Sequence, residues 1–306
     1  MSVVLASPSS TPDVGGGVPS GFSLSWTGWD GSAWSLSDRS DGLVVGPGVR
    51  GLGAPRVQHF RDESPAVDGA RWRGVRALSR EVFWPLWVLH DAAGQDWVYR
   101  DRAFWATLDP ELPGQWTVTQ PSGEYRTLTC RFESADDVSD VDPAVMGWAP
   151  YAVYLQADDP YWLGAPVTET FTSGGTVAYF STSGSVYGRS TANLLGAATM
   201  SNRGDVDAFP VWTITAGVGG VTTTTVGVGG RLIVVPIALT EGQSITVDTR
   251  PAARTATREN GTDVTSSLGA VDFAPIPAGE AQTLSLSMTG TGTVSASITP
   301  RFRRAW

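Results

Sequence analysis

The side chains best suited to catalysis are few in this chain of 306 residues, and none stands in a catalytic pattern. The two histidines are His59, in the strand-like run 56–60, and His90, which precedes Asp91 at the expected end of a strand. Neither belongs to a His-x-x-x-His pair and there is no Cys-x-x-Cys, so the sequence predicts no zinc site. A Gly-x-Ser-x-Gly nucleophile elbow is also absent. A Ser/His/Asp triad assembled in space stays open as an alternative, because its members need not be neighbours in sequence.

One acidic cluster has the side chains that calcium prefers. It lacks the glycine and the closing glutamate of an EF-hand loop, so a solvated loop is the favoured interpretation and a calcium site the alternative. The glycine runs at 15–17 and 217–220 have no Gly-Lys-Ser/Thr after them and predict loops. We therefore expect no metal, no cofactor and no enzymatic activity. The acidic cluster comprises Glu133, Asp136, Asp137, Asp140 and Asp142.

Cys130 is the only cysteine, so the chain cannot form an internal disulfide. It lies in an alternating run in which Leu128, Cys130 and Phe132 share one face of an expected strand. This pattern favours a small buried apolar residue over a reactive thiol.

Charge and hydropathy exclude two further classes of function. The chain has 21 basic residues, all arginine, against 30 acidic residues, and its net charge of −9 argues against a protein that grips nucleic acid. The absence of lysine suggests a GC-rich genome, such as that of an actinobacterium or its phage. The longest apolar run, Leu232–Leu239, is interrupted by Pro236, so no membrane span is predicted. The N-terminal residues lack a basic start and a long apolar core, which predicts synthesis in a cytoplasm without a secretion signal.

Short strands joined by turns are the expected elements, because the chain holds 36 Gly and 20 Pro among many Ser and Thr. Asp30-Gly31 and Asn260-Gly261 predict tight hairpin turns. The single expected helix is Arg100–Leu108, which Asp109-Pro110 ends. Pro85, inside the apolar segment 77–89, predicts an edge strand or a bulge. Further alternating strands are expected at 22–26, 116–118, 125–132, 211–215, 244–248, 254–258, 284–288 and 294–298.

Two domains follow an N-terminal arm in the expected organisation. Residues 1–20, rich in Ser, Pro and Gly, predict a flexible arm. The boundary is expected near Asp158–Gly164, where frequent aromatic and charged residues give way to Thr, Gly, Ser and Val. The domains are then 21–157 and 158–306. The fold class is all-β: a β-sandwich with one short helix, followed by a galectin-like or jelly-roll β-sandwich.

The 13 tryptophans allow two interpretations, core residues or contact residues. Trp26, Trp34 and Trp212 alternate with polar neighbours and are expected in cores. Trp162, near the domain junction, and Trp306 are candidate contact residues. Arg303 and Arg304, in the basic and aromatic ending, join them as candidates. A carbohydrate site in the C-terminal sandwich remains an alternative.

The order of motifs from Asn202 onward resembles the C-terminal half of the distal tail proteins of long-tailed phages. The resemblance rests on Asn-Arg-Gly-Asp-Val-Asp-Ala-Phe-Pro at 202–210, Val-Asp-Thr-Arg-Pro at 247–251 and Arg-Thr-Ala-Thr at 254–257. The N-terminal half is similar less specifically, through its Trp-rich start, the Gly-Val-Arg-Gly-Leu loop at 48–52, the Asp68-Gly69 turn and one helix. The ending Pro-Arg-Phe-Arg-Arg-Ala-Trp at 300–306 resembles that of such proteins from actinobacterial phages.

The resemblance implies a virion protein at the distal end of a siphophage tail. It would form a homo-oligomeric ring, expected to be a hexamer, between the tail tube protein and the tail hub or baseplate, with other tail-tip proteins as further partners. DNA would only pass through the lumen, which we expect to be acidic or neutral, since an arginine-lined channel would retain phosphates. Three alternatives remain: a carbohydrate-binding module for a host-wall glycan, a tail-associated hydrolase, and another minor tail or hub protein.

Overall fold

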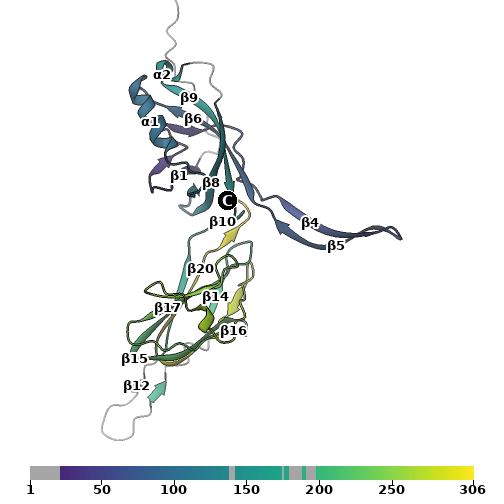
Figure 1. The fold of residues 1–306 in the computed structure, drawn as a ribbon, viewed down its shortest axis with the longest axis vertical. Coiled ribbons are helices and arrows are strands. Elements are labelled where there is room, and N and C mark those ends of the chain that lie inside the picture. The colour runs from purple at the N-terminus through teal and green to yellow at the C-terminus, as the bar shows by residue number, and fades with distance from the viewer. Residues whose placement is uncertain (1–20, 138–141, 174–175, 179–187, 191–197) are drawn as a thin grey trace, which may run out of the picture. The chain divides into compact units, whose positions relative to one another are not determined.

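The computed structural model describes residues 21–137, 142–173, 176–178, 188–190 and 198–306 (Figure 1). The fold is all-β, as predicted, with two short α-helices, α1 (Gln95–Trp105) and α2 (Pro143–Met146), where one was expected. The chain forms two compact units: unit 1 is Met1–Gly164 together with Phe302–Trp306, and unit 2 is Ala165–Arg301. The N-terminal segment 1–20, predicted to be flexible, lies outside the described residues.

Unit 1 is built on a nine-stranded sheet with the order β2-β1-β7-β8-β9-β6-β3, in which β10 also pairs with β8 and with β21. The strands alternate buried and exposed residues, the pattern of a sheet with one face against a core. Their bounds are β1 Ser23–Thr27, β2 Ala33–Ser35, β3 Leu43–Val45, β6 Arg80–Leu89, β7 Gly114–Thr119, β8 Tyr125–Asp137, β9 Trp148–Ala157, β10 Trp162–Leu163 and β21 Arg301–Phe302.

A chain of tryptophans fills the core of unit 1. Trp26 and Trp84 meet edge to face with ring centroids 5.3 Å apart, Trp116 lies 5.5 Å from Trp84, and Trp162 lies 5.1 Å from Trp116. All four side chains are fully buried. Edge-to-face and tilted aromatic pairs of this kind add stability beyond the area that they bury. The predicted core position of Trp26 is confirmed.

Helix α1 closes one side of this core but does not have the predicted bounds. It begins at Gln95, after Gly94 at φ 83°, and ends at Trp105, whereas the sequence predicts Arg100–Leu108. The apolar pair Trp97 and Val98 is separated from Phe104 and Trp105 by a mostly polar stretch, so hydrophobic spacing alone misses the first turn. Phe104 is fully buried, and Trp97 donates its indole N–H to the carbonyl of Val88 at 3.2 Å, which fixes the helix to β6.

Turn chemistry gives the hairpin that the sequence predicts at Asp30-Gly31, whereas the predicted turn at Asp68-Gly69 is wrong, because both residues lie in the strand Val67–Ala77. Asp30-Gly31 joins β1 to β2: Gly31 has φ 83°, and the Asp30 carboxylate accepts from the Ser32 N–H at 3.0 Å. Trp26 consequently pairs with Trp34 across the hairpin. The prediction for Pro85 is wrong, because β6 pairs with both β9 and β3. Pro85 has no N–H to donate, and this is tolerated because the neighbouring strand β3 already ends at Val45. The next residue, Gly46, donates its N–H to the Pro85 carbonyl.

A separate two-stranded hairpin, β4 (Val57–Ser64) and β5 (Val67–Ala77), leaves unit 1 between β3 and β6. Figure 1 shows it standing away from the sheet of its own unit as a long ribbon. All eight residues of β4 are exposed, so both faces of the ribbon meet solvent. We call this hairpin the arm.

Unit 2 is a β-sandwich around a six-stranded sheet with the order β11-β20-β15-β17-β18, in which β16 also pairs with β15. Trp212 is 1% exposed inside it, as predicted, among Ile214, Ile245 and Val294. The tight turn at Asn260-Gly261 follows β18, with Gly261 at φ 81°. The bounds are β11 Val167–Ser173, β12 Thr176–Ala178, β13 Gly188–Ser190, β14 Thr199–Ser201, β15 Val211–Val228, β16 Arg231–Val235, β17 Ser244–Asp248, β18 Thr255–Arg258, β19 Ala281–Thr283 and β20 Ser287–Ile298.

Two further predictions need correction. The acidic cluster is not a loop throughout, because β8 continues to Asp137 in register with β9; Asp140 lies outside the described residues. The first unit extends to Gly164, the far end of the predicted boundary region, and it includes Phe302–Trp306, which the prediction gave to the second domain. Sequence composition changes near the junction, but it cannot show that the chain returns.

Candidate assembly surfaces

Within the described ranges, no group of His, Cys, Asp and Glu side chains is arranged to hold a metal ion. Cys130 is buried as predicted, and that burial raises the pKa of its thiol. His59 accepts a hydrogen bond from the Trp72 indole N–H at 3.2 Å, so it belongs to the arm. In the part of the chain that is described, no helix is long and apolar enough to span a bilayer. The features that remain are surfaces.

One face of the arm carries three large apolar side chains. Pairing of Val57 with Ala77, His59 with Val75 and Arg61 with Trp72 places the apolar side chains of both strands on the same side. Val57 is 50% exposed, Val75 49% and Trp72 59%. Exposed large apolar side chains gathered on one side of a ribbon indicate a contact surface.

The opposite face of the arm carries Phe60 among polar and charged side chains. Arg76 donates to the Gln58 side chain at 3.0 Å and lies over the ring of Phe60 at 5.6 Å. Arg73, at the bulge opposite Phe60, forms an ion pair with Asp62. The first face therefore holds Val57, Trp72 and Val75 beside His59, Arg61 and Glu63, and it is the more apolar of the two faces. The second face holds Phe60 among polar and charged residues.

The sheet of unit 1 has a second apolar face, on the side away from its tryptophan core. Phe83 and Tyr154 face each other on β6 and β9 with ring centroids 5.0 Å apart, and Trp87 and Trp148 lie 5.4 Å apart further along. These four side chains are only partly buried and do not belong to the core cluster. We call them, with Pro85, Pro150 and Ala152 between them, the aromatic face.

A pocket of about 290 Å³ adjoins the aromatic face beside Phe83 and Tyr154. The loop 50–56 that leads into the arm lines its other side. Arg50 lies 5.4 Å above the Phe83 ring, and Arg56 pairs with Glu81 at 3.3 Å. The foot of the arm, the pocket and the aromatic face thus form one continuous region of unit 1.

The four residues predicted as contact surfaces come together in unit 1, but not as one surface. Trp162 is fully buried and donates its indole N–H to the Gly51 carbonyl at 3.3 Å, so that prediction is wrong for it. Trp306 is partly buried against Phe22, 5.0 Å between ring centroids. The side chains of Arg303 and Arg304 are exposed. Their backbone carbonyls accept hydrogen bonds from two other arginines, Arg80 and Arg126, which the sequence analysis did not select.

Arg80 is the most important of those residues. It is 3% exposed, and its guanidinium donates to the carbonyls of Pro160 at 2.7 Å, Gly51 at 2.6 Å, Arg303 at 2.9 Å and also Gly53. Burial lowers the pKa of Arg80 to about 10, so it keeps its charge at neutral pH. An arginine at the start of a strongly apolar strand was the available sign, since a buried guanidinium needs carbonyl or carboxylate partners.

The outer face of the six-stranded sheet in unit 2 is chemically different. Along the register of β11, β20, β15, β17 and β18, every outward residue is Ser or Thr except Val211 and Asp248. Neighbouring hydroxyls bond across strands, as between Thr170 and Ser295 at 2.8 Å. We call this the hydroxyl face. Its outward residues on these strands are Thr168, Thr170, Thr172, Val211, Thr213, Thr215, Ser244, Thr246, Asp248, Thr255, Thr257, Thr293, Ser295 and Ser297.

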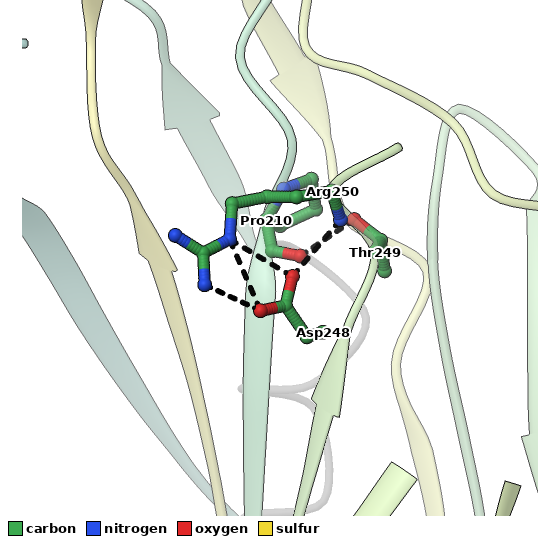
Figure 2. Close-up of polar contacts among 4 residues, drawn as sticks. All are labelled: Pro210, Asp248, Thr249 and Arg250. Atoms are coloured by element: carbon green, nitrogen blue, oxygen red, sulfur yellow. Dashed lines mark hydrogen bonds and ion pairs between the residues drawn. The ribbon is translucent and has the colours of Figure 1, made fainter. Parts of the chain in front are cut away.

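The one charge on the hydroxyl face is neutralised at its edge. Figure 2 shows Arg250 folded back onto Asp248, with Nε 3.0 Å from both carboxylate oxygens and Nη2 2.5 Å from one of them. Burial raises the pKa of Asp248, but the hydrogen bonds from Arg250 together lower it by more than burial raises it, so the net shift is downward. Between them, Thr249 donates its hydroxyl to the Pro210 carbonyl at 2.6 Å, which fixes the turn. The Val-Asp-Thr-Arg-Pro motif is therefore a structural turn.

No family model and no curated protein sequence matches this chain. Its fold is that of solved phage proteins. The structure of the SPP1 Dit protein (gp 19.1), a paradigm of the hub adsorption apparatus in phages that infect Gram-positive bacteria, superposes with a TM-score of 0.64 and 17% identity over 92% of this chain and 99% of that one. A chain of the phage P2 baseplate, in its activated conformation with calcium, gives a TM-score of 0.54 and 10% identity over 91% and 98%. The same baseplate with strontium gives 0.51 and 11% over 91% and 97%.

Proposed function

We propose that this protein is a structural component of a siphophage tail tip, a distal tail protein whose unit 1 forms a ring between the tail tube and the hub or baseplate. The observation that carries the proposal is the pair of open apolar surfaces on unit 1, the arm and the aromatic face. The shared fold with the SPP1 Dit and phage P2 baseplate chains supports the same role, because the likeness spans both units.

Two different surfaces on one unit suit a head-to-tail contact between copies. If the apolar side of the arm packs on the aromatic face of the next copy, each copy uses one arm and one face. A contact of this kind either grows without limit or closes into a ring, and closure leaves no surface unpaired. We expect six copies in the closed ring.

Charge favours the same pairing. Residues 57–77 carry four arginines and three acidic residues, and are thus net positive in a chain of net charge −9. Asp136 is exposed on the same side of the sheet as the aromatic face, and Glu81 lies there too, in its ion pair with Arg56. Opposite charges at the rim of an apolar contact orient the partners and suppress wrong pairings.

The other parts of the proposal concern the partners. The tail tube protein, the tail hub and further tip proteins are the expected neighbours in the virion. We also expect the lumen to be acidic or neutral so that DNA passes without being held. An arginine-lined bore in a ring structure would refute this part alone.

A structural, non-catalytic role suits unit 2 as well. Sugar-binding sites present aromatic rings on which a sugar can stack, and no outward position in the described register of the hydroxyl face is aromatic. Binding of a host-wall glycan is therefore second to the structural role.

The location in the virion tests the proposal directly. Gold-labelled antibodies against this chain should mark intact particles only at the tail end far from the head. Labelling along the whole tube, or on the capsid, would contradict it. Antibody against a purified tail tube protein serves as the control, since it should mark the length of the tail.

A further inference from the structure

Each residue of the segment Phe302–Trp306, which follows unit 2 in the sequence, has a specific place in unit 1. Phe302 lies under the Arg126 guanidinium at 3.7 Å, in the strand β21 that pairs with β10. The carbonyl of Arg304 accepts from Arg126 at 2.9 Å. Ala305 is fully buried and donates its N–H to the Leu52 carbonyl at 2.9 Å. With the Arg80 bond to Arg303 and the packing of Trp306 on Phe22, the segment is bound throughout its length.

The same arginine that holds this segment also holds the foot of the arm. Arg80 bonds to Gly51 and Gly53 in the loop that enters β4, and it begins β6, three residues after β5 ends at Ala77. One buried guanidinium therefore joins the entry to the arm, the exit from the arm and the returning segment. Without the Arg303 carbonyl, a buried charge would lose one of its partners, which destabilises the site.

We propose that unit 1 contains a binding groove for the segment Phe302–Trp306, and that filling this groove locks the base of the arm and makes unit 1 competent for assembly. The assembly part rests on the proposed function; the groove does not. The ligand class is a short peptide with aromatic residues at both ends, recognised mainly through its backbone carbonyls.

The order of synthesis gives this groove a consequence. At roughly 5–20 residues per second, a ribosome needs on the order of ten seconds to make unit 2 after unit 1 has emerged. During that time the groove is empty and the arm is not fixed. A chain that stops within unit 2 never fills it, so incomplete chains stay out of the ring.

Removal of the segment is the first test, with amide hydrogen exchange read by mass spectrometry in both units of one molecule. A variant lacking 302–306 should exchange at least about tenfold faster in the loop 50–56 and at β10, while unit 2 keeps its protection. Adding the synthetic peptide Arg-Phe-Arg-Arg-Ala-Trp should restore protection saturably, and the same peptide with Ala in place of Phe and Trp should not. Unchanged exchange in the shortened chain would overturn the proposal.

Full-length variants cover the case in which the shortened chain does not fold. Arg80→Gln should speed exchange of the Ala305 amide about tenfold or more, because a buried charged donor is lost. Arg131→Gln is the matched control: this arginine is in the same sheet, pairs with Asp158 at the surface, and should leave Ala305 unchanged. Equal effects from both variants would refute the lock.

Light scattering on the same samples separates the two claims. If the groove and the ring are both correct, the chain lacking 302–306 is monomeric and the peptide restores the oligomer. If exchange responds as described but the complete chain is also monomeric, the groove stands and the proposed ring fails. If the shortened chain assembles like the complete one, the lock does not control assembly and that part is wrong.

Discussion

The two units each expose one face of an antiparallel sheet, and the two faces have opposite chemistry. The aromatic face of unit 1 presents Phe83, Trp87, Trp148 and Tyr154, all partly exposed. The hydroxyl face of unit 2 presents Ser and Thr on the same kind of ladder, with its one carboxylate paired to Arg250. Exposed aromatic surface costs free energy in water until it is covered, whereas a hydroxyl surface is well solvated. Under the proposed function, this difference favours self-assembly through unit 1, whereas the hydroxyl face of unit 2 can remain in solvent.

The largest effect is expected on the aromatic face. The double variant Trp87→Ser/Trp148→Ser removes two contact tryptophans, and the loss of each should cost about 2 kcal/mol or more of association free energy. Association should therefore weaken at least about 1,000-fold. Sedimentation velocity across a range of concentrations measures it, and circular dichroism checks that the variant folds. The matched control on the hydroxyl face is Thr213→Val/Thr246→Val. If the control dissociates the assembly equally, the contrast between the faces is wrong.

The arm should give the next largest effect. Trp72→Ala should weaken association by about 2 kcal/mol, roughly 30-fold, because Trp is the residue that dominates most contact surfaces. The free energy of unfolding should change by less than about 0.5 kcal/mol, since the side chain is 59% exposed in the single copy. Tyr125→Ala removes an aromatic side chain of similar exposure, 42%, elsewhere on unit 1 and should leave association unchanged. A loss of folding stability in place of a loss of association would make the arm a structural element only.

A smaller, pH-dependent effect is expected at the edge of the hydroxyl face. The pKa of Asp248 is lowered in the folded state, so its contribution to stability is present above the unfolded value of about 3.9 and is lost as the pH falls through the folded value. We expect about 1 kcal/mol or less, because the Arg250 side chain is 60% exposed. Urea unfolding at pH 7 and pH 3 should show a smaller acid loss for Asp248→Asn than for the wild type. An identical acid loss in both proteins would show that the pair adds nothing.

The smallest effect should come from charging the hydroxyl face itself. Thr170→Glu, at an exposed position of β11, should change the free energy of unfolding by less than about 0.5 kcal/mol. It should also leave the state of assembly unchanged. Thermal unfolding and light scattering on one sample measure both quantities. A strong fall in association would show that the hydroxyl face is buried between copies, which would remove the distinction between the units.

Local rules predicted the parts of the fold that local chemistry determines. Asp30-Gly31 and Asn260-Gly261 give their turns because glycine adopts the positive φ that those positions need. Trp26 and Trp212 are buried because each alternates with polar neighbours on a strand with one buried face. The all-β class and the position of most strands follow from the same pattern.

Long-range packing decided what the sequence could not predict. Trp162 lies near a change of composition, which suggests a surface, yet it is buried because β10 joins the sheet of unit 1. The run 83–89 is apolar at nearly every position, so alternation cannot show that β6 has two apolar faces of different exposure. Arg303 and Arg304 attract attention through charge, but it is their carbonyls that are recognised, by Arg80 and Arg126 from distant parts of the chain.

The most direct test of assembly through unit 1 is the mass of the purified chain in solution, measured by light scattering with negative-stain images of the same peak. We expect a closed ring with a central hole and a mass close to six copies. At the same concentration, Trp72→Ala should increase the fraction of monomer, and Trp87→Ser/Trp148→Ser should increase it further. A monomer at every concentration, or a ring that survives both variants, would contradict the assignment of assembly to the arm and the aromatic face of unit 1.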